Sequence, residues 1–136
     1  MLKLAATAAV LAIVSIGAAA APNMPNARLN TSLPANSYTV NNWYKQSVYD
    51  PSDSKIGEVM DVLVDKSGKI SSLIIGVGGF LGAGEKDVAV PFSSVRITTK
   101  DNNKWYLVMN TTKDNLKKAP GFKYDKDATT WMPEKK

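Results

Sequence analysis

The sequence predicts a mainly β protein, either a small closed barrel or a sandwich. Short apolar stretches rich in Val and Ile recur between residues 47 and 109, and Gly, Pro, Asp and Ser turn signals separate them. A single segment, which begins near residue 113, carries both helix start and helix stop signals. Short strands at regular spacing, without an alternating helix, favour a barrel or sandwich over an α/β fold.

Residues 1–20 are predicted to form a signal peptide. Lys3 gives a positive start, an uncharged apolar run follows, and small residues then supply an Ala-x-Ala cleavage pattern. A transmembrane anchor is the alternative, because the 18 residues from Leu4 to Ala21 lie near the lower limit for a span. The alanine-rich end of the run is only weakly apolar and favours cleavage after Ala20. The mature chain would then be periplasmic, with no stable membrane anchor.

Residues 21–46 are predicted to be a flexible N-terminal linker. They are rich in Asn, Ser, Thr and Pro, and they show no sustained period of two or 3.6 residues. The end of this segment carries large side chains that could pack back onto the domain or form a short edge strand: Tyr38, Val40, Trp43 and Tyr44.

The first predicted strands form a hairpin. Ser47 to Tyr49 is a short strand that an Asp-Pro-Ser-Asp turn ends. Lys55 to Asp65 is long for a strand, and apolar residues of both parities predict that it bends strongly. Gly68 supplies positive φ in the connection from 65 to 69, and Ile70 to Val77 returns antiparallel.

Three more strands and one helix complete the predicted domain. Val88 to Pro91 is a strand whose proline marks an edge, a bulge or the strand end. Segments 95–99 and 105–109 follow on either side of an Asp-Asn-Asn turn. Thr112 is the N-cap of a helix over 113–118, and residues 125–136 form a tail. The expected core includes Val62, Val64, Ile74, Val88 and Val90.

The order of these pieces resembles the PRC-barrel family. The matching pieces are Ile56-Gly57 with Asp61, Asp65…Gly68, Gly78-Gly79-Phe80-Leu81-Gly82, Val88-Ala89-Val90-Pro91-Phe92 and Lys113…Leu116…Ala119-Pro120. The resemblance implies a small closed β-barrel of five or six antiparallel strands with one short C-terminal helix, spanning residues 47–124. It also implies a barrel that binds other macromolecules, as in the photosynthetic reaction centre H subunit and a ribosome maturation factor. It assigns structural roles to Gly57 and Pro91, and no catalytic residue.

The glycine-rich loop is the candidate interaction site: Gly78, Gly79, Phe80, Leu81 and Gly82. A phosphate-binding loop would lead into a helix, whereas this one leads into a strand. Phe80 and Leu81 could equally cap the barrel mouth or enter a groove on a partner. Asp61 and Gly68 are expected to be structural, with the Asp61 carboxylate in a hydrogen bond rather than serving as a functional acid.

Composition argues against catalysis and cofactors. The chain has no His and no Cys, which removes the usual nucleophile–base pairs, the usual zinc ligands and disulfides. Four aspartates could suggest calcium, but they lack the EF-hand spacing: Asp50, Asp53, Asp61 and Asp65. The net charge of +5 is diffuse, whereas nucleic-acid binding needs a concentrated basic patch. We expect no enzyme, cofactor, metal or nucleic-acid partner.

The expected function is therefore that of an exported interaction or assembly module in the bacterial envelope. Its partner would be an unidentified protein or a second copy of the chain. The alternative is a periplasmic binder of a small ligand or an envelope polymer, which would use the glycine loop and the aromatic residues.

Overall fold

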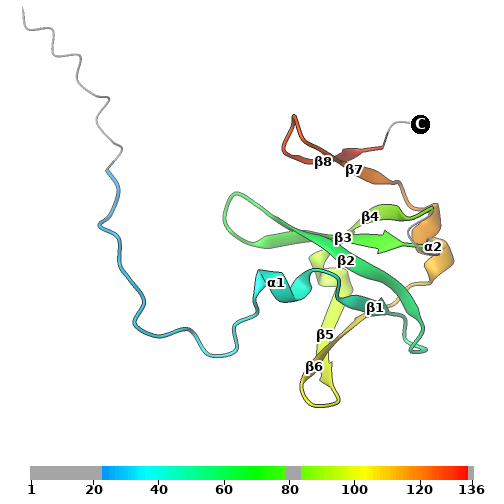
Figure 1. The fold of residues 1–136 in the computed structure, drawn as a ribbon, viewed down its shortest axis with the longest axis horizontal. Coiled ribbons are helices and arrows are strands. Elements are labelled where there is room, and N and C mark those ends of the chain that lie inside the picture. Colours follow the sequence, from blue (N-terminus) through cyan, green and yellow to red (C-terminus); the bar gives the residue numbers. More distant parts are fainter. Residues whose placement is uncertain (1–22, 79–83, 135–136) are drawn as a thin grey trace, which may run out of the picture. The chain divides into compact units, whose positions relative to one another are not determined.

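The computed structural model describes residues 23–78 and 84–134, and the chain divides into two units, Met1–Ala35 and Asn36–Lys136. Residues 23–35 of the first unit contain no helix or strand. The described part of the second unit contains one eight-stranded sheet and two short helices, α1 (Val40–Trp43) and α2 (Lys113–Lys118) (Figure 1).

The strands run in the order β5-β6-β1-β2-β3-β4-β7-β8. Neighbouring strands are antiparallel except β1 and β6, which are parallel. A single 3₁₀ turn, Phe92–Ser94, connects β4 to β5. The strand bounds are β1 (Ser47–Tyr49), β2 (Lys55–Val64), β3 (Ile70–Val77), β4 (Lys86–Pro91), β5 (Val95–Lys100), β6 (Lys104–Met109), β7 (Phe122–Asp125) and β8 (Thr130–Pro133).

The mainly β prediction is confirmed, but the closed antiparallel barrel of five or six strands is not what the structure shows. Strands β5 and β8 lie at the two ends of the sheet order, so the described sheet is open. Two additional strands come from residues after Gly121, where the sequence shows too little apolar patterning to reveal a hairpin. The parallel contact between β1 and β6 joins segments almost sixty residues apart, which local patterns cannot reveal.

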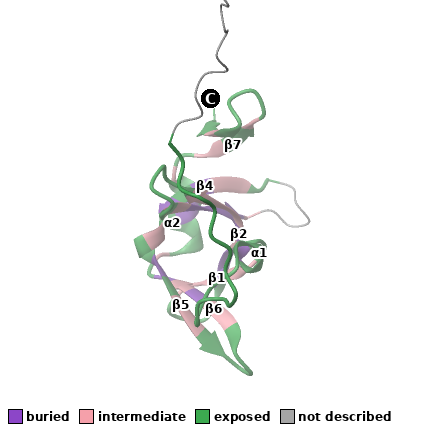
Figure 2. Ribbon diagram, turned by 90° about the vertical axis from the view of Figure 1, so that its left-hand side faces the viewer, coloured by how far each residue is buried: buried purple, intermediate pink, exposed green. Residues whose placement is uncertain are grey.

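The main core lies on one face of the sheet, in the middle of the folded unit (Figure 2). It contains Trp43, Val48, Ile56, Val59, Leu73, Ile75, Val77, Val88, Val90, Val95, Leu107, Met109 and Leu116. Trp43 is 1% exposed, so the folded unit includes residues before Ser47. Of the expected core residues, Val88 and Val90 lie in this cluster and Val62 packs against it, but the expectation for Val64 was wrong, since it is 56% exposed.

The error at Val64 comes from irregular pairing along β2. The register between β2 and β3 shifts once between Val59 and Asp61 and again between Leu63 and Val64. Each bulge adds a residue to one strand and exchanges the faces of the residues that follow. Parity counted along the sequence therefore fails at Val64, although the predicted strong bend in this strand is consistent with the bulges.

Gly57 allows β2 and β3 to approach closely. A Cβ atom at this position would lie 2.7 Å from the carbonyl oxygen of Gly76 and 2.7 Å from Cγ2 of Ile75. Both distances are shorter than real contacts, and the first is to backbone, which cannot move freely. A side chain here would push the two central strands apart. The structural role expected for Gly57 therefore has a direct steric cause.

The turn between β2 and β3 is built around Asp65. Its Oδ1 accepts hydrogen bonds from the backbone N–H of Ser67 at 2.9 Å and of Lys69 at 3.0 Å, and from the Ser67 hydroxyl at 2.6 Å. The bond from the Ser67 hydroxyl is the main reason that the pKa of Asp65 is lowered. Gly68 has φ of +89°, which is the left-handed backbone that the sequence predicts for this position.

The β7–β8 hairpin reaches the opposite face of the central strands through Trp131. Ile74 is fully buried there, opposite Asp61 on β2. The indole Nε1 of Trp131 donates a hydrogen bond of 2.8 Å to Oδ2 of Asp61, while the Val62 N–H donates to Oδ1 at 2.7 Å. The Asp61 carboxylate thus connects β2 to β8. Figure 1 shows the hairpin beside β4.

Helix α2 forms as the sequence predicts. The Thr112 hydroxyl accepts a hydrogen bond from the Asn115 N–H at 3.1 Å, and Leu116 points into the core. Asp114 lies in the first turn and two lysines lie in the last, which suits the helix dipole. Across residues 23–78 and 84–134, neither helix has the length and apolarity that crossing a bilayer requires.

Candidate functional site at helix α1 and the β5–β6 hairpin

The glycine-rich loop predicted as the interaction site lies mostly outside the described residues. Gly79, Phe80, Leu81 and Gly82 belong to that undescribed segment, so the alternatives of capping and partner contact both remain predictions. Gly78 is described, and its φ is +76°. A Cβ atom at Gly78 would lie 3.1 Å from Cε of Lys117, which places the start of the loop beside helix α2.

The other predicted residues occupy separate places in the fold. Pro91 is the last residue of β4 and the N-cap of the 3₁₀ turn, so it marks a strand end. The four aspartates considered for calcium do not converge: Asp50 and Asp65 cap turns, Asp53 bonds Tyr106, and Asp61 bonds Trp131. Within the described ranges, no group of three or more carboxylates is arranged to hold a metal ion.

An exposed aromatic patch surrounds helix α1. Tyr38, Val40 and Tyr44 are each between 55% and 66% exposed, although they lie next to the core. Beneath them, Trp43 is buried and packs edge-on against Trp105, with ring centroids 5.2 Å apart. The Tyr38 ring packs edge-on against the same Trp105 at 5.0 Å. Three large exposed side chains within seven residues form a cluster that is unusual for a solvent-facing surface.

Backbone hydrogen bonds hold this aromatic patch in place. The Thr39 hydroxyl caps α1 by accepting from the Asn42 N–H at 3.3 Å. After the helix, the Lys45 N–H donates to the Val59 carbonyl at 2.7 Å, and the Val59 N–H donates to the Gln46 carbonyl at 2.8 Å. Because α1 is tied to β2 on one side and anchored by Trp43 on the other, its exposed side chains are presented on a fixed base.

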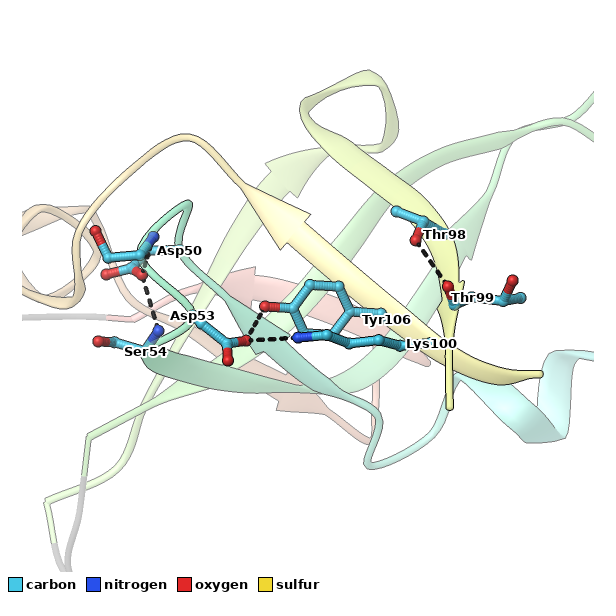
Figure 3. Close-up of polar contacts among 8 residues, drawn as sticks. Asp50, Asp53, Ser54, Thr98, Thr99, Lys100 and Tyr106 are labelled. Atoms are coloured by element: carbon cyan, nitrogen blue, oxygen red, sulfur yellow. Dashed lines mark hydrogen bonds and ion pairs between the residues drawn. The ribbon is translucent and has the colours of Figure 1, made fainter. Parts of the chain in front are cut away.

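A second feature, the tyrosine–lysine face, lies on the outer side of β1, β5 and β6. The rings of Tyr49 and Tyr106 stack with centroids 4.8 Å apart and an interplanar angle of 27°. Lys100 places its Nζ atom 4.2 Å from the centre of the Tyr106 ring. Asp53 lies in the loop after β1 and contacts both Tyr106 and Lys100 (Figure 3). Its carboxylate accepts a hydrogen bond from the Tyr106 hydroxyl and forms an ion pair of 3.3 Å with Lys100.

These contacts shift the titration of both acids. The hydrogen bond from the Tyr106 hydroxyl is the main cause that lowers the pKa of Asp53, with Lys100 contributing as well. The same hydrogen bond raises the pKa of Tyr106 to about 12. Tyr106 is therefore a protonated donor and Asp53 an ionised acceptor throughout the physiological range, so the pair acts as a fixed polar clamp rather than as an acid–base couple.

Two shallow grooves border the tyrosine–lysine face. The smaller, of about 390 Å³, connects the end of α1 at Lys45 to Tyr49 and Tyr106. The larger, of about 970 Å³, lies beyond Tyr106 and is lined by residues that include Arg96 and Lys100. The aromatic patch, the tyrosine–lysine face and the grooves thus belong to one end of the sheet.

Sequence reasoning identified the side chains around α1 but missed the tyrosine–lysine face. The signal was present as alternation along the β5–β6 hairpin. Arg96, Thr98 and Lys100 on β5 alternate with Val95, Ile97 and Thr99, and the residues paired with the first three on β6 include Tyr106 and Val108. A strict period of two on both arms places all five side chains on one face.

Comparison with known protein families gives a match to the PRC-barrel domain over residues 35–116. The match covers more than half of the chain. The chain belongs to the PRC-barrel family. No curated protein matches it.

The matched region defines which parts of this PRC-barrel protein are shared with its family. It begins just before helix α1 and ends inside helix α2, so it includes the aromatic patch and strands β1 to β6. The β7–β8 hairpin lies beyond its C-terminal end. The candidate site therefore belongs to the family domain, and the hairpin lies outside the matched region.

Proposed function

We propose that this PRC-barrel protein is an exported, non-catalytic module that binds a protein partner in the cell envelope. The observation that carries this proposal is the aromatic patch, in which Tyr38, Val40 and Tyr44 are exposed on a base anchored by Trp43. Tyrosine is enriched at energetically important positions of protein interfaces. A rigid base reduces the entropy that a partner must overcome on binding.

The chemistry of the folded unit supports a role without catalysis. The chain contains no His and no Cys, so the residues most often used for proton transfer and nucleophilic attack are missing. The most perturbed tyrosine, Tyr106, has a pKa of about 12 and cannot exchange its proton usefully near neutral pH. We propose that the protein works without a cofactor and does not bind nucleic acid.

Export is the part of the proposal that rests on residues 1–20 alone. N-terminal sequencing of the protein from a periplasmic fraction is expected to begin at Ala21. Intact Met1 in the membrane fraction would instead establish a retained anchor and would place the folded unit at the membrane surface.

The partner contact can be tested with surface variants. Tyr38→Ser with Tyr44→Ser removes two exposed rings while leaving Trp43 in the core, so we expect the melting temperature to change little. Val64→Ser is the matched control, because Val64 is as exposed as the patch residues but lies at the end of β2. Sedimentation velocity measures self-association, and affinity enrichment from solubilised envelopes measures capture of other proteins.

The proposal expects the double variant to lose association and the Val64→Ser control to retain it. Equal association of both variants with the parent protein would exclude the aromatic patch as the interface. Loss of association by both variants would show that the contact is non-specific.

A second candidate function is the binding of an envelope polymer. The grooves beside the tyrosine–lysine face favour this candidate, because they combine aromatic rings, cations and hydroxyl groups on an exposed sheet surface.

A further inference from the structure

The larger groove on the outer face of the β5–β6 hairpin has an uneven charge. Among its described lining residues there are two cations, Arg96 and Lys100, and no carboxylate. Lys100 is already paired with Asp53, which partly neutralises it. Arg96 has no ion pair and no side-chain hydrogen bond among the described residues. The uncompensated charge of this groove is therefore concentrated on the Arg96 guanidinium.

The groove also carries polar groups with unused bonding capacity. The hydroxyls of Ser93 and Ser94 and the amide of Asn110 line it, and none has a side-chain hydrogen bond within the described part of the chain. These groups can donate and accept hydrogen bonds in several directions. Beside them, Pro51 and Val108 provide apolar surface. Hydroxyl and amide groups next to an apolar strip and one strong cation suit a ligand that is itself rich in hydroxyls and carries an acid.

The rigidity of one wall distinguishes this groove from an ordinary polar surface. Tyr106 is fixed by stacking on Tyr49, by Lys100 near its ring centre, and by its hydrogen bond to Asp53. Its ring is therefore held in one orientation before any ligand arrives. A ligand that packs against this wall does not have to order it, which is an advantage for a weak, shallow site.

The spacing of the cations favours an extended ligand. Arg96 and Lys100 are four residues apart on one strand, so their backbone positions are separated by about 13 Å. Lys100 is already held by Asp53 and lies over the Tyr106 ring, so a single small anion would contact Arg96 alone. A nucleic acid, which carries a dense row of phosphates, would need more cations than the one uncompensated arginine. A polymer with widely spaced acidic groups fits better.

We propose that this groove binds an acidic polysaccharide whose sugar rings carry carboxylates. Arg96 pairs with one carboxylate through two parallel N–H donors, the geometry in which guanidinium groups hold carboxylates best. Ser93, Ser94 and Asn110 bond the sugar hydroxyls, Pro51 and Val108 contact the apolar face of a ring, and the edge of the fixed Tyr106 ring bounds the site. This inference rests on the second candidate function, because it names the class of envelope polymer.

The test is titration calorimetry, at low and moderate salt, with a six-residue oligomer in which glucuronic acid alternates with an uncharged sugar, so that its carboxylates are widely spaced. The matched ligand is the same oligomer with its carboxylates methyl-esterified, which keeps the hydroxyls and removes the charge. Arg96→Gln removes the cation, Arg96→Lys keeps the charge without the planar pair of donors, and Lys66→Gln is the control. Lys66 is an exposed cation in the β2–β3 turn, away from the groove. Circular dichroism establishes that each variant is folded.

We expect the parent protein and Lys66→Gln to bind the acidic oligomer alike, and Arg96→Gln to bind about tenfold more weakly. Arg96→Lys should fall between them, and the esterified oligomer should bind as weakly as the acidic oligomer binds to Arg96→Gln. The inference is overturned if the parent protein does not bind at millimolar oligomer. It is also overturned if folded Arg96→Gln binds like the parent, if Lys66→Gln loses as much affinity, or if a single-stranded oligonucleotide of equal charge binds as tightly.

Sedimentation velocity of Arg96→Gln separates this inference from the proposed protein contact. Arg96 lies outside the aromatic patch, so the variant should associate like the parent protein even when it no longer binds the oligomer. The Tyr38→Ser, Tyr44→Ser variant should give the reverse result. It should lose association with its protein partner and still bind the oligomer.

Discussion

The two hairpins at the ends of the sheet are attached in very different ways. The β5–β6 hairpin joins the sheet through the parallel pairing of β6 with β1, and it contributes Val95, Leu107 and Met109 to the core. The β7–β8 hairpin joins through a single residue pair, Asp87 with Phe122, and contains no buried side chain. The comparison shows that similar local structures can serve either as part of the core or as an attachment to its surface.

Electrostatics reinforces the difference between the hairpins. At the β5–β6 end, Asp53 is satisfied by Tyr106 and Lys100, and its pKa is lowered. At the junction of β4 with β7, Oδ1 of Asp87 is buried and has no hydrogen-bond partner among residues 23–78 and 84–134. Burial, with the nearby carboxylates of Glu85 and Glu134, raises the pKa of Asp87. The second junction therefore contains an unfavourable charge at neutral pH, whereas the first contains a favourable pair.

The largest expected difference concerns the core contributions of the hairpins. Leu107→Ala removes a fully buried side chain of β6 and should lower the free energy of unfolding by about 2–5 kcal/mol. Met132→Ala changes an exposed position of β8 and should cost less than about 0.5 kcal/mol. Urea denaturation of both variants measures these values. Similar losses would mean that the β7–β8 hairpin is as integral to the core as β5–β6.

The next expected effect concerns the bond that secures the β7–β8 hairpin. Trp131→Phe removes the indole N–H that donates to Asp61 and should cost about 1 kcal/mol. Hydrogen exchange should become faster in β7 and β8, with β5 and β6 unchanged. Met132→Ala is the control, because it changes an exposed side chain of the same hairpin and leaves the bond between Trp131 and Asp61 in place. Uniform acceleration across all strands would show that the hairpin does not open separately.

A spectroscopic effect is expected at the β5–β6 end. Because the Asp53 carboxylate raises the pKa of Tyr106 to about 12, Asp53→Asn should lower that pKa towards 10.0, the ordinary value for tyrosine. Ultraviolet absorbance during an alkaline titration measures the change. The raised pKa stabilises the fold below about pH 10, and this contribution disappears as the pH rises through 12. A Tyr106 titration that is unchanged in Asp53→Asn would show that the carboxylate does not control the hydroxyl in solution.

The smallest expected effect is on stability at the β4–β7 junction. Here the substitution should stabilise the protein, whereas the core and hairpin substitutions above should destabilise it. A raised pKa means that ionisation of Asp87 disfavours the native state, so stability decreases as the pH rises above the ordinary value of 3.8. Asp87→Asn should therefore raise the melting temperature slightly at pH 7, and this gain should disappear below pH 3.8. Calorimetry at several pH values tests both parts. A gain that persists unchanged at low pH would have a cause other than charge.

Most of the strands, turns and helices were predictable, because nearby residues in the sequence determine where they begin and end. The β2–β3 turn follows from Asp65 and Gly68, the start of α2 follows from Thr112, and strands β1 to β6 follow from their flanking turns. The exposure of Val64 was not predictable, since the pairing of β2 with β3 shifts twice, once by an extra residue in β2 and once, just before Val64, by an extra residue in β3. The β7–β8 hairpin was missed because none of its own side chains is buried, and hydrophobic patterning is the signal on which strand prediction depends.

The candidate site also combines features that the local sequence reveals with features that depend on distant contacts. Tyr38, Val40, Trp43 and Tyr44 were recognisable as a group of large side chains, but sequence could not decide which of them enters the core. That choice depends on Trp105, a partner about sixty residues away. The clamp of Asp53 on Tyr106 likewise joins a loop to a distant strand, so no local spacing could have indicated it.

The central claim is that this protein binds its partner through the α1 end of the sheet and not through the β7–β8 hairpin. Site-specific photocrosslinking in intact cells tests it directly, with the photoreactive residue placed at Tyr44 in one variant and at Met132 in another. Both positions are exposed, so both variants should fold normally. We predict a discrete crosslinked protein, or a crosslinked dimer, from position 44 and none from position 132. Crosslinks from position 132 alone, or from neither position, would contradict the claim.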